Sequence, residues 1–246
     1  DRSEPRSRQQ TLNGCSHRAP LHRDFAEVYR RAVDGRRLNL AALVLAAGAG
    51  SRFGDERGAK LLADLDGLPM LQRVLDEVRA YGPAATVVVL GHGADTVAST
   101  LDWRDEVRVR NHEPERGLAS SLQVGIDALR LWPEPLDGAF IVLGDQPRLS
   151  ADTLRSLAAA ASEARPADRS AVVPRYRDPG PRNPVLLLRP AWSWVDDLQG
   201  DRGLGPLIDA RPDMALEVRV EGAMPDVDTP DDLERLRADG ERPRAD

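Results

Sequence analysis

A glycine-rich segment close to a lysine carries the clearest chemical signal in the chain. Residues 45–54 have the letters LAAGAGSRFG, and Lys60 follows six residues after the last glycine. Small residues let backbone N–H groups approach phosphate oxygens closely, and basic side chains such as Arg52 and Lys60 can neutralise the phosphate charge. The segment therefore predicts a loop that cradles phosphate groups.

Lys60 is the only lysine in a chain whose 34 lysines and arginines are otherwise all arginine. An ammonium group is a compact, strongly hydrated point charge, whereas a guanidinium is a planar fork. The exception indicates a preference for the compact cation at this position.

Two familiar phosphate-binding motifs do not fit the segment. The dinucleotide fingerprint GxGxxG would need a glycine where Phe53 stands, and the third glycine comes one position late, at Gly54. The Walker A motif would need Gly-Lys-Ser/Thr, whereas Lys60 follows Ala59 and precedes Leu61. The segment is therefore neither a standard Rossmann redox loop nor a P-loop.

A carboxylate that follows another apolar run is a candidate metal ligand. Residues 139–143 are apolar and the letters GDQP come directly after them, which places Asp145 at the end of a predicted strand. In open α/β sheets ligands bind at the carboxyl ends of strands, and Mg²⁺ is often shared between carboxylates and substrate phosphates. The alternative is a plain strand-to-helix turn in which Asp145 bonds only to nearby backbone.

The elements that must position these residues alternate along the chain, as in βαβ units with a mainly parallel sheet. Pro69, Ser150 and Thr229 stand where a first helical turn or an N-cap is expected. We predict strands at 42–46, 86–90, 107–110, 139–143, 171–174, 185–188 and 216–220, and helices at 70–81, 94–101, 119–132, 151–164, 204–210 and 230–237.

The chain of 246 residues, 41% of them hydrophobic, is long enough for one α/β domain and short for two. We assign residues 1–38 to a polar tail with a short amphipathic helix, 39–238 to the domain and 239–246 to a charged tail. Cys15, His17 and His22 lie in the first tail without a fourth ligand, so we expect no zinc site there.

Composition excludes several classes of function. The net charge of −6 gives no basic face for nucleic acid, and no apolar run approaches the ~20 residues that span a bilayer. The lone cysteine excludes an intramolecular disulfide, and the Arg-rich start lacks the apolar core of a secretory signal. We therefore expect a cytoplasmic protein that binds neither nucleic acid nor membrane.

The glycine-rich segment with Lys60, Leu61 and Leu62 resembles the signature of the nucleotidyltransferases typified by the molybdopterin and sugar-phosphate enzymes. The resemblance implies a single Rossmann-like three-layer α/β domain of the nucleotide-diphospho-sugar transferase type, with a mainly parallel sheet. It also implies Arg52, Lys60 and Asp145 as catalytic residues. The nucleotide-binding residues that it implies are Leu45, Ala46, Ala47, Gly48, Gly50, Ser51, Arg52, Lys60, Gly91, Ser120 and Ser121.

Three further segments resemble the same family. The letters PDVDTPDDL near the C-terminus imply Asp228 as a second ligand of Mg²⁺ beside Asp145, whereas we assign Asp226 to helix capping alone. A Ser-rich helix start at Ser120 and Ser121 would receive a base or phosphate, or would only cap its helix. The acceptor-binding residues that the third segment implies are Arg182, Asn183 and Pro184.

Two segments depart from the family pattern. Pro181 and Arg182 precede Asn183 where a glycine is commoner, and Leu204-Gly205 replaces Ala-Arg in the segment that begins at Gly200. An arginine that could contact the acceptor is therefore absent at that position.

Within the family, the loops resemble the cytidylyl branch that acts on molybdenum cofactor. This implies transfer of CMP from CTP to the terminal phosphate of molybdopterin, with release of pyrophosphate, and a molybdenum hydroxylase or its chaperone as partner. A phosphate acceptor is already ionised, so no general base is needed and we expect no catalytic role for His92 or His112. The alternatives are another phosphorylated acceptor, a flavin- or nicotinamide-dependent reductase, and a non-catalytic protein that delivers cofactor.

Overall fold

The computed structural model describes residues 37–48, 50, 53, 58–163, 170–177 and 180–240. The predicted helix in the first tail and the Cys15, His17 and His22 group lie outside these residues, as do 241–246. No helix in the described ranges is long and apolar enough to cross a membrane.

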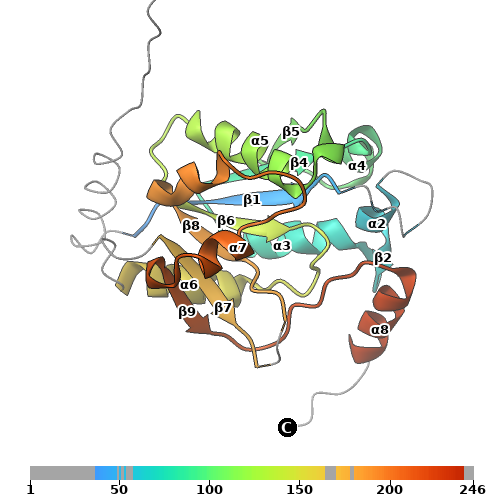
Figure 1. Cartoon of the computed structure of the whole chain (residues 1–246). Helices are drawn as coiled ribbons and strands as arrows, with labels where there is room; N and C mark the ends of the chain where they lie inside the picture. The colour runs from blue at the N-terminus through green and yellow to red at the C-terminus, as the bar shows by residue number, and fades with distance from the viewer. Residues whose placement is uncertain are drawn as a thin grey trace, which may run out of the picture.

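A seven-stranded sheet forms the centre of the fold (Figure 1). Among the described strands, four of the six pairings are parallel, and β8 is antiparallel to both of its neighbours. This confirms the predicted mainly parallel sheet. The spatial order is β5 (Val107–Arg110), β4 (Ala85–Leu90), β1 (Leu40–Ala46), β6 (Gly138–Leu143), β8 (Val185–Leu188), β7 (Ala171–Arg175) and β9 (Ala215–Arg219).

Helices cover both faces of the sheet, which confirms the three-layer arrangement (Figure 1). One face packs against α3 (Met70–Tyr81), α4 (Ala94–Thr100) and α6 (Ala151–Glu163). The other packs against α5 (Leu118–Arg130), the 3₁₀ helix η4 (Arg189–Val195) and α7 (Gly205–Asp209). Every residue of β1 is buried, because alternate side chains enter the two cores, and this explains its continuous apolar sequence.

Shorter elements complete the fold. A hairpin joins β2 (Asp64–Leu65) to β3 (Leu68–Pro69) beside the short helix α2 (Ala59–Leu62). The last helix, α8 (Pro230–Gly240), packs two leucines against this region. Two further 3₁₀ turns are η2 (Pro114–Arg116) and η5 (Pro212–Met214).

The predicted elements have the expected type, with corrections at their ends. Helix α5 covers 118–130 instead of 119–132, because Pro133 disfavours helical geometry at the residue before it. Helix α8 continues to Gly240, past its predicted end at residue 237. Strand β1 begins two residues earlier than predicted, β9 is shifted one residue toward the N-terminus, and α4 and α7 are shorter at their ends. The sequence patterns did not predict α2 or the hairpin, since four- and two-residue elements are too short to show a period.

Two helix starts have the capping chemistry that the sequence predicts. The Thr153 N–H donates to Ser150 Oγ (3.2 Å) at the start of α6. Thr229 and Asp232 form a reciprocal pair at the start of α8: the Asp232 N–H donates to Thr229 Oγ1 (3.2 Å), and the Thr229 N–H donates to Asp232 Oδ2 (2.8 Å). The two side chains thereby accept from backbone N–H groups at the start of the helix, in the manner of a capping box.

A buried ion pair fastens α3 to the loop before β5. The Glu106 side chain is only 4% exposed, and Arg79 Nε donates to its Oε1 (2.6 Å). The Arg104 N–H donates to Oε2 (2.7 Å), and Arg79 also donates to the Asp102 carbonyl (2.6 Å). Burial alone would raise the pKa of Glu106, but these hydrogen bonds outweigh burial and the pKa lies below its ordinary value.

We expect Glu106→Gln to lower the free energy of unfolding by about 2 kcal/mol at neutral pH, because the amide would turn a donor toward a backbone N–H. A carboxylate with a lowered pKa stabilises the fold above its unfolded-state pKa, and this contribution is lost as the pH falls through the folded-state value. Urea unfolding from neutral pH down to about pH 3 should therefore show the difference between variant and wild type shrinking.

Glu234 provides a matched control, since it pairs with Arg237 on α8 and its side chain is 68% exposed. Glu234→Gln should change stability by less than about 0.5 kcal/mol. A Glu106→Gln difference that stays constant across the pH series would contradict the ionised, hydrogen-bonded state assigned to this carboxylate.

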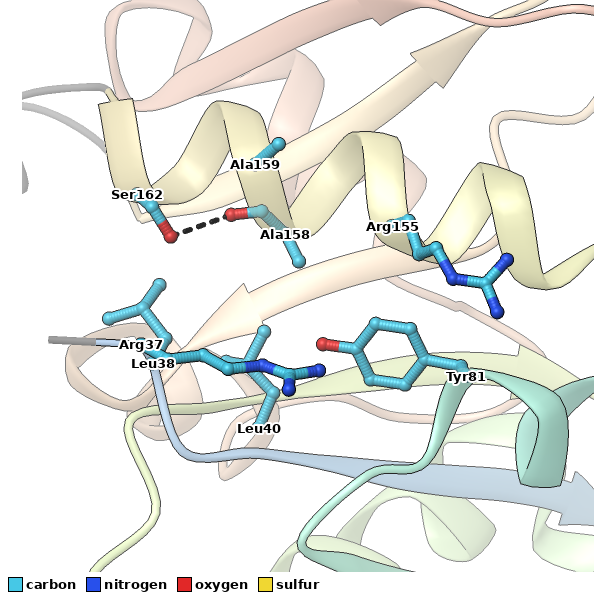
Figure 2. A pocket seen from close by; sticks show the side chains of 8 residues that line it. All are labelled: Arg37, Leu38, Leu40, Tyr81, Arg155, Ala158, Ala159 and Ser162. Carbon is cyan, nitrogen blue, oxygen red and sulfur yellow. Dashed lines mark hydrogen bonds between the residues drawn. The ribbon is translucent and has the colours of Figure 1, made fainter.

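A small cavity of about 220 Å³ lies near the amino end of β1, away from the glycine-rich segment (Figure 2). Figure 2 shows the Tyr81 hydroxyl pointing toward the Arg37 guanidinium, with Arg155 on the adjacent helix α6. Arg155 donates to Asp152 (2.6 Å) and to the Ala80 carbonyl (2.7 Å). Burial raises the pKa of Tyr81, and the two guanidinium groups offset part of that effect. The cationic groups here already have partners within the fold.

Candidate active site

The glycine-rich segment and Asp145 meet at one edge of the sheet, because β1 and β6 are parallel neighbours. Leu45 pairs with Leu143, and the Gly144 N–H donates to the Leu45 carbonyl (2.9 Å) just beyond that pair. A cavity of about 730 Å³ opens at this edge. The described residues that line it are Leu45, Ala47, Gly48, Gly50, Pro114, Glu115, Gly117, Leu118, Ser121, Leu143, Asp145, Asp201, Asp226 and Asp228.

Lys60 joins two of these carboxylates. From helix α2, its Nζ donates to Asp145 Oδ2 (2.6 Å) and to Asp228 Oδ1 (2.8 Å). Burial alone would lower the pKa of Lys60, but the charges and hydrogen bonds of Asp145 and Asp228 outweigh it, so the pKa lies above its ordinary value. The ammonium is therefore charged at neutral pH and links three segments that are distant in the sequence.

The sequence predicts a helix-capping role for Asp226, and the structure shows otherwise. The cap of α8 is made by Thr229 and Asp232, whereas Asp226 Oδ1 accepts a hydrogen bond from Gln146 Nε2 (2.6 Å) and lines the cavity. Burial raises the pKa of Asp226, and the nearby charges of Asp145 and Asp228 raise it further. Asp226 is thus a third carboxylate of the site, and the alternate placing of Asp226 and Asp228 in an extended segment was the signal for it.

The donor set at this edge fits a hard divalent cation. Asp145 and Asp228 offer carboxylate oxygens that converge on one point, now held by the Lys60 ammonium. In the described ranges, no group of three or more His, Cys, Asp and Glu side chains could hold a metal ion unaided. A cation here would complete its shell with water and ligand phosphates, as Mg²⁺ commonly does.

The two serines at the start of α5 have different surroundings. Asn111, which is buried, donates from Nδ2 to both Ser120 Oγ (2.8 Å) and Ser121 Oγ (3.0 Å). Ser120 Oγ in turn donates to the Gly117 carbonyl (2.8 Å), whereas Ser121 lines the cavity. The Ser120 hydroxyl is therefore bonded within the first turn of α5 and makes no side-chain cap, and Asn111, which follows β5, is a positioning residue that sequence reasoning missed.

Glycines allow two close loop contacts around the cavity. A Cβ at Gly91, in the loop after β4, would lie 2.5 Å from the Ala47 carbonyl oxygen. A Cβ at Gly117 would lie 2.4 Å from the carbonyl carbon of Gly200 and 2.6 Å from Asp201 Oδ1. Because side chains are excluded at these positions, both loops lie against neighbouring backbone; Gly117 lines the cavity, whereas the predicted residue Gly91 lies behind the lining residue Ala47 and is not among the described lining residues.

A second cavity of about 200 Å³ adjoins the first and shares Leu45, Leu118 and Leu143 with it. Arg182 and Asn183 line it, so the structure places these predicted residues beside the larger cavity, with Pro184 next in the chain. Arg182 already pairs with Asp209 of α7 (2.5 Å). The departure at Leu204-Gly205 also falls on the lining of this cavity.

The remaining predicted residues are placed as follows. Ala46 ends β1 and is buried, next to the lining residues Leu45 and Ala47. His92, which we did not expect to be catalytic, lies 3.1 Å from Glu115 of the cavity wall through Nε2, and His112 is exposed. Ser51 and Arg52 lie outside the described residues.

The three-layer fold, with Lys60, Asp145 and Asp228 meeting at its edge, is similar to that of a solved nucleotidyl transferase. The chain belongs to the MobA-like family: the family model described as "MobA-like NTP transferase domain" matches residues 42–215.

Solved structures agree with this assignment. Rv0371c from Mycobacterium tuberculosis H37Rv is 32% identical, with a TM-score of 0.66 over 81% of this chain and 98% of that one. A structure of the same protein in complex with manganese matches with 28% identity and a TM-score of 0.66, over the same shares of the two chains. A nucleotidyl transferase from Methanothermobacter is 27% identical, with a TM-score of 0.63 over 81% of this chain and 96% of that one.

Among curated proteins, the bifunctional protein GlmU of Desulfitobacterium hafniense (strain DSM 10664 / DCB-2) is 38% identical over 117 residues. The match covers 48% of this chain and 24% of that protein. The chain therefore spans about a quarter of the length of this curated relative.

Proposed function

We propose that the protein transfers CMP from CTP to the terminal phosphate of molybdopterin or molybdenum cofactor and releases pyrophosphate. The observation that carries the proposal is the convergence of the glycine-rich segment, Lys60 and the Asp145–Asp228 pair at one edge of the sheet. The letters of the glycine-rich segment and of the GDQP and NPVL segments support the cytidylyl branch and the molybdopterin acceptor.

In the proposed reaction, an oxygen of the acceptor phosphate attacks the α-phosphorus of the nucleotide. The bond from the α-phosphorus to the oxygen that bridges it to the β-phosphate breaks, and pyrophosphate leaves with the bonding electrons. Such transfers depend on positioning and on neutralisation of charge. The acceptor phosphate is already ionised, so no side chain has to remove a proton.

Each part of the site has a role in this scheme. Backbone N–H groups of the segment that begins at Ala47 bind the triphosphate, and Lys60 balances charge on the α-phosphate and on the leaving group. Ser51 and Arg52 are expected to act with them. Asp145 and Asp228 would hold Mg²⁺ or Mn²⁺, which supplies further charge neutralisation. The manganese complex of the Mycobacterium tuberculosis relative supports a divalent cation.

The two adjoining cavities suit two substrates. We assign the nucleotide to the larger cavity, which the glycine-rich segment lines, and the acceptor to the smaller one beside Arg182 and Asn183. The shared residues Leu45, Leu118 and Leu143 mark the junction between them. We further propose that the product passes to a molybdenum hydroxylase or its chaperone in the cytoplasm.

The test is pyrophosphate release with Mg²⁺ and each of CTP, GTP, ATP and UTP, with metal-free or molybdenum-loaded molybdopterin as acceptor. We expect release with CTP and not with the other three nucleotides. Release with a different nucleotide would keep the transfer and reject the cytidylyl assignment. Binding of molybdopterin without release from any nucleotide would reject the transfer and favour cofactor delivery.

A further inference from the structure

Lys60 holds the position where Asp145 and Asp228 converge. Its Nζ lies 2.6 Å from Asp145 Oδ2 and 2.8 Å from Asp228 Oδ1, and its side chain is 12% exposed. A divalent cation that used these two oxygens together would need the space that the ammonium fills. Lysine and cation therefore compete for the same pair of ligands.

The ammonium can move while the rest of the residue stays in place. A Cβ at Gly50 would lie only 3.0 Å from Lys60 Cβ, so the stem of the lysine packs directly against the glycine-rich segment. Beyond Cβ, the side chain continues through three more methylene groups with free rotation. The same stem position allows the ammonium to reach either the aspartates or a phosphate bound by the segment.

The charges of the cavity favour such an exchange. Besides Asp145 and Asp228, its described lining contains Glu115, Asp201 and Asp226, and none of these described lining residues is basic. A nucleotide adds several negative charges of its own. A divalent cation supplies twice the positive charge of the ammonium to the aspartates, and the ammonium that it displaces can then pair with phosphate.

We propose that Lys60 and a divalent cation exchange at the Asp145–Asp228 pair. The ammonium bridges the aspartates in the nucleotide-free protein, and binding of the cation with a nucleotide moves it to the phosphates. The inference rests on the proposed function for the phosphates that receive Lys60. Because the lysine has to leave, the nucleotide strengthens cation binding, and by linkage the cation strengthens nucleotide binding by the same factor.

The first measurement follows the ammonium itself. Since this chain of 246 residues has a single lysine, the same chain labelled with ¹⁵N-lysine has one side-chain ammonium signal, which needs no assignment. We expect the signal to shift, and its hydrogens to exchange with water faster, when Mg²⁺ is added with a CTP analogue that has a methylene bridge between its α- and β-phosphates. An unchanged signal at saturating cation and analogue would overturn the exchange.

The second measurement follows the cation. Mn²⁺ alone is titrated into nucleotide-free protein and detected by electron paramagnetic resonance. Lys60→Met should bind Mn²⁺ at least about tenfold more tightly than wild type, because the tethered competitor is gone. Arg235→Met is the matched control, since it removes the same charge from a side chain 73% exposed on α8, and it should change the affinity less than about twofold. Unchanged or weaker Mn²⁺ binding by Lys60→Met would overturn the proposal.

These measurements require no turnover, so the two proposals fail separately. If no nucleotide supports pyrophosphate release while Lys60→Met still binds Mn²⁺ more tightly, the transferase assignment is rejected and the competition between lysine and cation is supported. If pyrophosphate release proceeds while the ammonium signal and the Mn²⁺ affinities stay unchanged, the proposed exchange is rejected and the transferase assignment is supported.

Discussion

Lys60→Ala should lower kcat/KM for pyrophosphate release at least about 10²-fold, because a charge aimed at the reacting phosphates in a partly buried site is lost. The same change removes the link between Asp145 and Asp228, which lie near a third carboxylate, Asp226. Activity should therefore fall while cation affinity rises. The measurement is a steady-state assay across nucleotide and Mg²⁺ concentrations. We expect that added Mg²⁺ does not restore the rate of the variant.

Two further variants control this result. Arg235→Ala removes one positive charge from an exposed position and should leave kcat/KM within about twofold of wild type. Lys60→Arg keeps the charge but replaces a compact ammonium with a planar fork, and we expect it to recover only part of the lost activity. If kcat/KM of Lys60→Ala were within threefold of wild type, a margin that corresponds to about 0.7 kcal/mol, Lys60 would have no direct role in the reaction.

Among glycine-to-alanine changes in the site, Gly117→Ala should disrupt the structure most. Gly117 has φ 88° and ψ −175°, a conformation that is nearly exclusive to glycine. Its new Cβ would also lie 2.4 Å from the carbonyl carbon and 2.5 Å from the carbonyl oxygen of Gly200, both backbone atoms. We expect a loss of about 3 kcal/mol or more in the free energy of unfolding, together with loss of pyrophosphate release. Urea unfolding and the release assay measure the two effects.

Gly200→Ala separates conformational strain from collision. Gly200 has φ +66°, but a Cβ there would meet nothing within 4 Å. Strain alone predicts a loss of about 1–2 kcal/mol for this variant. Equal losses for Gly117→Ala and Gly200→Ala would show that the contact between the two loops does not matter.

Features that depend on neighbours in the chain could be predicted from the sequence. The apolar run of β1, the period of α3 and the caps at Ser150 and Thr229 follow from interactions over a few residues, and the structure has all of them. The glycine-rich segment was recognisable for the same reason, because its spacing lies within one loop.

The direction of β8 could not be predicted from such patterns. Its four apolar residues predict a buried strand, and the structure has one. The strand is antiparallel to β6 and β7, however, and a continuous apolar run looks the same in either direction. The orientation follows only from how the chain enters and leaves the sheet.

By itself, the sequence determined the candidate chemistry: a phosphate loop, one lysine and aspartates at the ends of elements. The tertiary structure decided which of them meet. Lys60 reaches Asp228 across 168 positions, and Asp226 turns to Gln146 instead of capping α8. Ser120 and Ser121 share the amide of Asn111, which no local pattern marked. The physical reason is that periodicity and capping act over a few residues along the chain, whereas a charge selects its partner by distance in space, which the packing of the sheet sets.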